Sequence, residues 1–262
     1  MKKPKKKLSY LFTSVLILSL QLPFVFARPA GPLSLSVPST IDHPMVSTTN
    51  NGEVPGERKI SVYDSLHLGD LDLSRQAFDF AMIGYKTLRS MGKLTNDSII
   101  SIIDFSLSSA TKRLFVLDIK NYKVLFNTYV AHGKNSGLEF AREFSNNPRS
   151  NKSSLGFYVT GETYDGEHGY SLRLDGEEKG INNNAYKRAI VMHCASYASE
   201  NYIRERGYLG RSLGCPAIPK SVYKPLIETI KDGSCLFFYS PNKNYLSHSV
   251  FLRSAIDSYA KS

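Results

Sequence analysis

The sequence predicts a mainly β fold with a few helices. Short apolar runs rich in β-branched and aromatic residues dominate the chain after Asn96, and only some neighbouring runs are separated by a helical pattern. One long amphipathic helix precedes them. With 262 residues, 42% hydrophobic and 11% aromatic, the chain can form one or two packed domains and is too rich in core-forming residues to be largely disordered.

The N-terminus combines a basic segment with an apolar one. Five lysines lie within the first seven residues, and residues 8–26 are mostly apolar with a few polar interruptions and Pro23. This pattern is typical of a secretory signal peptide, so we expect residues 1–27 to be removed after Ala27. An uncleaved anchor is the alternative, because about 20 apolar residues can span a bilayer. We therefore expect an exported protein of the periplasm or cell envelope, which contacts the membrane only through this segment if it remains uncleaved.

The charge balance is mildly basic. Lys and Arg outnumber Asp and Glu 33 to 23, and without residues 1–27 the balance is 28 to 23, or +5. This small excess argues against nucleic acid as a partner and fits a protein that binds anionic envelope polymers.

Residues 28–58 are rich in Pro, Ser, Thr and Asn, which predicts a flexible tether.

A helical segment is expected over residues 59–95. Apolar residues recur three or four positions apart from Leu73 to Leu88, which predicts a helix over residues 75–90. Ser74 is placed to cap its first turn. We expect this helix to pack on the domain that follows.

Residues 96–245 are predicted to form the β-rich domain, followed by a C-terminal tail at 246–262. Short helices are expected at 198–206, ended by Gly207, and at 222–231. The polar segment 133–154 has no periodicity, and a functional lid and a solvated loop both remain open. The expected strands cover residues 99–105, 114–119, 124–130, 157–160, 170–174, 189–192 and 235–239.

Cys215 is the first candidate for a chemical role. It lies in a loop bounded by glycine and proline, whereas core thiols usually lie in apolar strands. Gly214 removes a side chain where a ligand could approach, and Pro216 stiffens the loop and biases Cys215 away from helical geometry. Such a loop can hold a nucleophile in one orientation, but a thiol also needs a basic or positive neighbour to ionise.

His193 is the leading partner for Cys215. It ends a buried apolar run, so its side chain can project into a cleft, and we expect it to take the thiol proton. Cys194 and Cys235 are predicted to be core thiols, and a disulfide between them remains possible. A zinc site made from these cysteines and His193 is disfavoured, because the chain has no C-x-x-C pair and consecutive strand residues face opposite ways. We expect no metal and no cofactor.

The stretch from His193 to Cys215 resembles the signature of L,D-transpeptidase catalytic domains. In that signature a His is followed, after a spacer, by Ser or Thr, His, Gly and Cys; here the second part reads Ser212, Leu213, Gly214, Cys215. Leu213 departs from the usual His and puts the hydrogen bonds of that position in doubt. The wider segments 126–133, 153–161, 168–176 and 210–219 resemble the murein L,D-transpeptidase catalytic domain family over about residues 60–245.

The resemblance implies a β-sandwich with the cysteine at the floor of a cleft. It also implies acyl transfer from peptidoglycan stem peptides: Cys215 would attack the bond before a terminal D-alanine, and an amine acceptor would then replace the sulfur. By analogy, the carbonyl of Cys194 would orient His193. An L,D-carboxypeptidase, a non-catalytic wall-binding module and another cysteine hydrolase remain alternatives.

Further residues are candidates for supporting roles around the thiol. Backbone N–H groups of Gly214 and Cys215 are candidates for an oxyanion hole, because Pro216 has no N–H, and Ser212 belongs to the same loop. Arg211 could bind a stem-peptide carboxylate or help to keep the thiol ionised. The remaining candidates for substrate contacts are His132, Gly133 and Tyr170.

Overall fold

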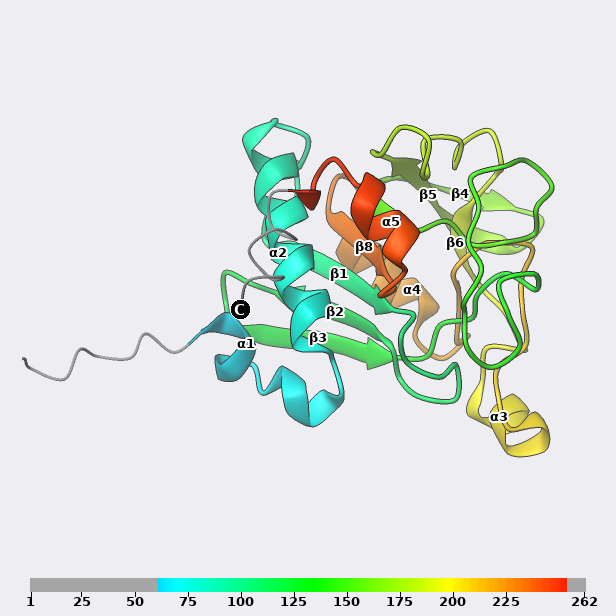
Figure 1. Cartoon of the computed structure of the whole chain (residues 1–262). Helices are drawn as coiled ribbons and strands as arrows, with labels where there is room; N and C mark the ends of the chain where they lie inside the picture. The colour runs from blue at the N-terminus through cyan, green and yellow to red at the C-terminus, as the bar shows by residue number, and fades with distance from the viewer. Residues whose placement is uncertain (1–60, 254–262) are drawn as a thin grey trace, which may run out of the picture. The chain divides into compact units, whose positions relative to one another are not determined.

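The computed structural model describes residues 61–253 (Figure 1). The predicted signal peptide of residues 1–27 and the tether of residues 28–58 lie outside these described residues. Between residues 61 and 253 no helix is both long and apolar enough to cross a membrane.

The described chain is mainly β with a few helices, as predicted. The strands are β1 Ile99–Asp104, β2 Leu114–Asp118, β3 Lys123–Thr128, β4 Gly156–Gly166, β5 Gly169–Gly176, β6 Val191–Cys194, β7 Ala217–Ile218 and β8 Cys235–Tyr239. The helices are α1 Val62–Ser65, α2 Arg75–Ser90, α3 Glu200–Arg206, α4 Tyr223–Ile230 and α5 Lys243–His248, with a 3-10 turn at Leu68–Leu71.

Within residues 61–253 the strands form one sheet in the order β3-β2-β1-β8-β4-β5-β6-β7. The chain after β3 returns to the far end of this order, where the N–H of Ala131 donates to the carbonyl of Ala217 at 2.8 Å. The sheet therefore curls until its two ends meet, which gives the barrel-like sandwich that the resemblance implied. This closure also brings residues 131–134 beside the segment that carries Cys215.

The parallel strands β1 and β8 form the buried centre of the sheet. All residues of both strands are buried, which agrees with their continuous apolar sequences. The long helix α2 lies along β1 and β8 (Figure 1). Gly84 of α2 approaches β4 so closely that a Cβ at this position would lie 2.1 Å from the ring of Phe157. A larger residue at position 84 would therefore force the helix away from the sheet.

Helix α2 confirms the prediction made from the apolar spacing. It spans Arg75–Ser90, and the Ser74 Oγ accepts from the Ala77 N–H at 3.1 Å as an N-cap. At the C-terminal end of β8, the Tyr239 hydroxyl donates to Gln76 Oε1 at 2.6 Å and joins this strand to the first turn of the helix. The predicted packing of the helix on the β domain is therefore observed.

The start of β6 differs from the prediction. The apolar run suggested a strand over residues 189–192, but β6 spans Val191–Cys194. Ala189 has a φ of 51°, a left-handed conformation that interrupts an extended chain. His193 therefore lies within a paired strand, where its backbone as well as its ring is held.

Two elements left no clear pattern in the sequence. β7 has only two residues, and α5 is a short helix capped by Asn242, whose Oδ1 accepts from the Tyr245 N–H. Beyond α5, Phe251 is buried and packs edge-on against Phe157 at 5.4 Å between ring centroids. The described residues of the predicted tail thus contribute to the core.

Candidate active site

The Ser212 side chain organises the loop that carries Cys215. Its Oγ accepts from the Gly214 N–H at 3.0 Å and donates to the Cys215 carbonyl at 2.6 Å. The Ser212 N–H donates to the His132 carbonyl at 2.9 Å, and the Lys134 N–H donates to the Ser212 carbonyl at 2.8 Å. The loop is therefore fixed both internally and against the segment that closes the sheet.

Gly214 is needed for the packing of this loop. Its φ of 131° lies in the region that favours glycine, and a Cβ would lie 2.9 Å from the Lys152 carbonyl and 3.2 Å from Arg188 Nη2. The space beside Gly214 is thus filled by the protein itself, whereas the sequence suggested room for a ligand. Because its N–H already donates to Ser212, Gly214 has no free donor for an oxyanion in this conformation. The Cys215 N–H, in contrast, has no hydrogen-bond partner among the described residues.

His193 lies on β6, and the Cys215 loop leads directly into the neighbouring strand β7. His193 pairs with Ala217 across the parallel β6–β7 ladder, and its N–H donates to the Pro216 carbonyl at 3.4 Å. The His193 Nδ1 lies 3.0 Å from the Cys194 carbonyl. A carbonyl can only accept, so Nδ1 carries the proton and Nε2 keeps its lone pair. The orienting carbonyl expected from the resemblance is therefore present.

His168 covers the imidazole of His193. It lies in the turn between β4 and β5, and the two rings stack with centroids 4.3 Å apart. Burial lowers the pKa of His193, and the neighbouring His168 lowers it further, against the opposing effect of the Cys194 carbonyl. The base is thus held neutral at neutral pH.

Cys215 is also held in its neutral form. Burial raises the pKa of its thiol, while the Val191 N–H and the positive charge of Arg188 act in the opposite direction. The Sγ lies 3.6 Å from the Ala189 carbonyl, to which it donates. A raised thiol pKa and a lowered imidazole pKa leave Cys215 and His193 neutral at rest.

Arg188 is a site residue that the sequence reasoning missed. Its Nη1 donates to the Ser145 carbonyl at 2.6 Å and to Ser154 Oγ at 2.7 Å, and its Nη2 donates to the Lys152 carbonyl at 2.5 Å. The guanidinium thereby fastens the 133–154 segment beside the thiol. Arg188 lies in an irregular turn with no motif around it, so no local signal distinguishes it from an ordinary surface arginine.

Comparison with known protein families gives a match over most of the described chain. A family model described as the L,D-transpeptidase catalytic domain matches residues 70–239, which include both His193 and Cys215. The chain belongs to this family.

Two solved structures show a distant similarity to this chain. An L,D-transpeptidase from Mycobacterium smegmatis is 12% identical with a TM-score of 0.34, and the match covers 55% of this chain and 59% of that one. The helical cell shape determining protein Pgp2 from Campylobacter jejuni is 11% identical with a TM-score of 0.37, over 56% of this chain and 49% of that one. The chain thus spans less than two thirds of the length of these structures. No curated protein matches it.

His132 does not lie on the surface of this L,D-transpeptidase domain. It is fully buried, its Nδ1 lies 2.7 Å from Nη2 of the buried Arg113, and its Nε2 lies 3.3 Å from the Gly137 carbonyl. Since an arginine only donates, Nδ1 accepts and Nε2 carries the proton. Both ring nitrogens are occupied, so the predicted substrate contact has no exposed atom to make it, and His132 instead joins the sheet to the 133–154 segment.

The other three predicted substrate contacts are also engaged by the protein. A Cβ on Gly133 would lie 2.6 Å from the Asn151 carbonyl and 3.0 Å from the Gly214 Cα, so this glycine packs against the Cys215 loop. Arg211 is exposed and donates to the carbonyls of Lys134 and Gly137 at 3.4 and 3.3 Å. Its charge does not contribute to the pKa shift of Cys215, whereas that of Arg188 does. The Tyr170 hydroxyl donates to Glu228 on α4.

The cysteines of the described chain are all free. Cys194 and Cys235 lie on β6 and β8, which are separated by β5 and β4 in the sheet order. At about 4.8 Å per strand they are much farther apart than the 4.4–6.8 Å that a disulfide requires between Cα atoms. The disulfide considered from the sequence is therefore not formed.

Among residues 61–253 no three His, Cys, Asp or Glu side chains cluster as metal ligands.

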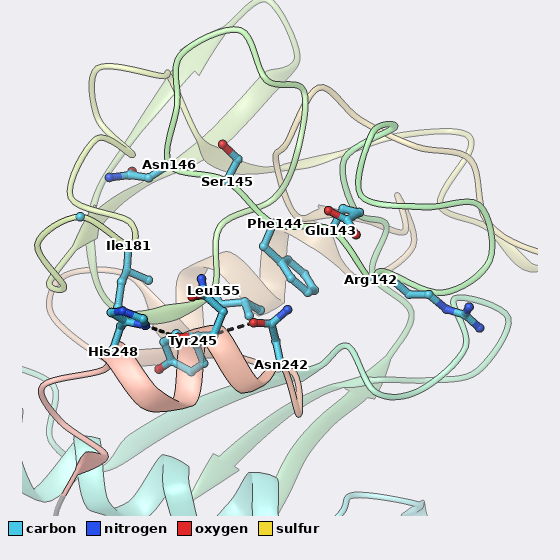
Figure 2. Close-up of a pocket in the computed structure, with 12 residues that line it drawn as sticks. Arg142, Glu143, Phe144, Ser145, Asn146, Leu155, Ile181, Asn242, Tyr245 and His248 are labelled. Carbon is cyan, nitrogen blue, oxygen red and sulfur yellow. Dashed lines mark hydrogen bonds between the residues drawn. The ribbon is translucent and has the colours of Figure 1, made fainter.

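A hollow of about 310 Å³ lies away from the thiol, between residues 142–146, the 180–181 turn and α5 (Figure 2). Neither Cys215 nor His193 lines it. Ser145 connects the two regions, because its carbonyl accepts from Arg188. Another cavity, of about 140 Å³, is bordered by residues 189–191, and neither Cys215 nor His193 lines it.

Proposed function

We propose that this chain is a peptidoglycan L,D-transpeptidase in which Cys215 is the nucleophile and His193 is the general base. The observation that carries the proposal is the pairing of β6 with β7, in which the His193 N–H donates to the carbonyl of Pro216, the residue after Cys215, while Nδ1 donates to the Cys194 carbonyl. The unprotonated Nε2 is left to accept the thiol proton. Membership of the L,D-transpeptidase family supports the choice of substrate class.

In the first half-reaction, His193 Nε2 takes the Cys215 proton as the sulfur attacks the carbonyl that joins a diamino acid to the terminal D-alanine. The Cys215 N–H is placed to donate to the resulting oxyanion. The carbon–nitrogen bond then breaks, His193 returns the proton to the departing amine, and D-alanine leaves. A thioester on Cys215 remains, and no cofactor is required to balance the step.

In the second half-reaction, the amine of a second stem peptide attacks the thioester. Neutral His193 accepts a proton from this amine, the carbon–sulfur bond breaks, and the proton returns to sulfur. A new amide cross-links the two stems. Water in place of the amine would give a carboxylic acid, so the same site would then act as an L,D-carboxypeptidase.

This function requires the protein to reach the cell wall. The predicted signal peptide and the acidic nature of wall stem peptides fit an exported, mildly basic protein of the cell envelope. We infer that the protein acts there on peptidoglycan stem peptides.

The test is incubation with purified tetrapeptide stems, followed by mass spectrometry of the products and of the protein. We expect D-alanine release, a cross-linked product and a thioester on Cys215. Cys215→Ser should abolish all three. Cys194→Ser is the matched control, because it removes a neighbouring thiol but keeps the carbonyl that orients His193.

Two results would contradict the proposal. D-alanine release that persists in Cys215→Ser would exclude Cys215 as the nucleophile. Binding of tetrapeptide by the wild-type protein without any release of D-alanine would identify a non-catalytic wall-binding module. The ratio of cross-linked to hydrolysed product would separate a transpeptidase from a carboxypeptidase.

A further inference from the structure

The hollow between residues 142–146, the 180–181 turn and α5, here the α5 hollow, has a lining that suits an uncharged polar ligand. Asn146, Asn242 and Asn244 border it, and its volume of about 310 Å³ lies at the lower end of the range for small-molecule sites. Its two ionised lining residues, Arg142 and Glu143, have opposite charges. The hollow thus offers amide groups for hydrogen bonds without a net charge that would select an ion.

Apolar side chains form part of the same wall. Phe144, Leu155 and Ile181 border the α5 hollow beside the asparagines (Figure 2). An N-acetylated sugar has the matching surfaces, because its hydroxyl and acetamido groups exchange hydrogen bonds with amides while its ring C–H groups and acetyl methyl are apolar. The lining is therefore complementary to a sugar of this kind.

Several lining groups retain unused hydrogen-bonding capacity. Asn242 Oδ1 accepts from the Tyr245 N–H, but Asn242 Nδ2 has no partner among residues 61–253. Within the same residues, the Asn244 side-chain amide has no partner and the Arg142 guanidinium donates no hydrogen bond. None of these atoms is a buried unpaired group, so all are open to solvent in the hollow. Asn146 differs, because the turn after β5 already engages its amide.

The α5 hollow begins close to the loop that carries Cys215. Arg188 Nη2 lies 3.2 Å from the position that a Cβ on Gly214 would take, and Arg188 Nη1 donates to the Ser145 carbonyl at 2.6 Å. Ser145 lines the hollow. One guanidinium group therefore separates the nucleophile loop from the hollow.

The α5 hollow continues into a neighbouring one. A hollow of about 410 Å³ shares Arg142 and Asn242 with it and extends to Phe105 and Phe140. The two together form a groove that is longer than a single sugar needs. A groove of this length fits a polymer better than a small molecule.

We propose that this groove binds the glycan strand that carries the stem peptide, with an N-acetylated sugar in the α5 hollow. The inference rests on the proposed function, because that function makes stem peptides the substrate. A stem is joined to its sugar through its N-terminus, so three residues of a tetrapeptide lie between the sugar and the attacked bond. Three extended residues span about 10–11 Å, which is enough to pass Arg188 and reach the hollow. The protein should therefore prefer glycan-linked stems to free stem peptides.

The test measures binding in a Cys215→Ala background, in which the nucleophile is absent. Calorimetry would compare a free tetrapeptide with the same tetrapeptide joined to its N-acetylated disaccharide. With the hollow intact, the disaccharide-linked peptide should bind at least about 10-fold more tightly. Asn244→Ala should reduce this gain about 2- to 10-fold, because it removes neutral hydrogen bonds. Asn244→Trp should block the hollow and abolish the gain, while the affinity for the free tetrapeptide stays unchanged.

Asn201→Ala is the matched control. Asn201 is likewise an exposed asparagine on a short helix, but it lies on α3 and does not line either hollow of the groove. This variant should keep the full gain. The unchanged tetrapeptide affinity of Asn244→Trp would in addition show that this variant is folded.

Three results would overturn the proposal: equal affinities for the two ligands with the hollow intact, the same gain in Asn244→Trp, or a loss of tetrapeptide affinity in Asn244→Trp as large as that of the disaccharide-linked peptide. The last result would place peptide in the hollow. Because Cys215→Ala cannot turn over, these results are independent of catalysis. If the wild-type protein releases no D-alanine while the gain depends on Asn244, the proposed enzyme activity fails and the glycan site stands.

Discussion

The His193 N–H donates to the carbonyl of Pro216, the residue that follows Cys215, at 3.4 Å. This backbone bond joins the strand of the proposed base to the strand that follows the proposed nucleophile. The sheet therefore holds the His193 backbone against the end of the loop that carries Cys215, while Ser212 fixes the loop itself. Substitutions of side chains around His193 and Cys215 leave this backbone bond in place.

Arg188 should control the ionisation of Cys215. Burial raises the thiol pKa, and Arg188 partly opposes this shift. We expect the pH at which iodoacetamide alkylates Cys215 half-maximally to lie above that of an ordinary thiol, and to rise further in Arg188→Gln. Arg188→Lys should give an intermediate value. Peptide mass spectrometry would follow Cys215 separately from Cys194 and Cys235.

Arg211→Gln is the control for this experiment. The Arg211 guanidinium faces the carbonyls of Lys134 and Gly137, so its removal should not change the alkylation profile. An unchanged profile in Arg188→Gln, or an equal shift in both variants, would contradict the role of Arg188.

The His168 ring should determine the pH below which kcat/KM falls. Because burial and His168 lower the pKa of His193, the base stays neutral to a lower pH than an ordinary histidine, and kcat/KM should fall only below about pH 6.5. His168→Ala removes the ring that stacks on His193 and its electrostatic effect on that residue. The pKa of His193 should therefore rise, and the fall in kcat/KM should begin at a higher pH. His168→Phe keeps a stacked ring and should move it less.

His248→Ala would serve as the control for the pH profile. His248 lies on α5 and is not among the groups that perturb His193. A profile that is the same in His168→Ala and wild type would show that the stacked ring has no influence on the base.

Ser212 should position the nucleophile loop without taking part in the chemistry. Its hydroxyl bonds both the Gly214 N–H and the Cys215 carbonyl, so Ser212→Ala removes two hydrogen bonds of about 1 kcal/mol each. We expect kcat to fall about 10- to 100-fold with a smaller change in KM. Ser212→Thr keeps the hydroxyl and should restore most of the rate; equal losses in both variants would contradict this role.

His132 should make the folded state sensitive to mild acid. Burial and the adjacent Arg113 lower the pKa of His132 to about 3, whereas an unfolded histidine titrates near about 6.5. Between these values the unfolded chain binds a proton that the folded chain does not, so stability falls as the pH falls. The slope from this residue is at most about 1.4 kcal/mol per pH unit.

Urea denaturation at pH 7, 6 and 5 would measure this effect. His132→Asn keeps an acceptor for Arg113 and removes the titrating group, so its unfolding free energy should depend less steeply on pH than that of the wild type. Parallel pH dependences for the two proteins would contradict the prediction.

The sequence by itself determined the mainly β character, helix α2 with its Ser74 cap, and the candidate pair of Cys215 and His193. These features are local: apolar spacing reports which face of an element is buried, and a cysteine between glycine and proline is unusual whatever surrounds it.

Only the tertiary structure decided which charges and rings surround that pair. Arg188 comes from a segment with no motif, and it reaches the Cys215 loop because the turn before β6 packs against Gly214 and the Lys152 carbonyl. The burial of His132 and the neutral state of Cys215 have the same origin. Solvation and electrostatic interactions depend on contacts between residues far apart in the chain, and no local pattern encodes them.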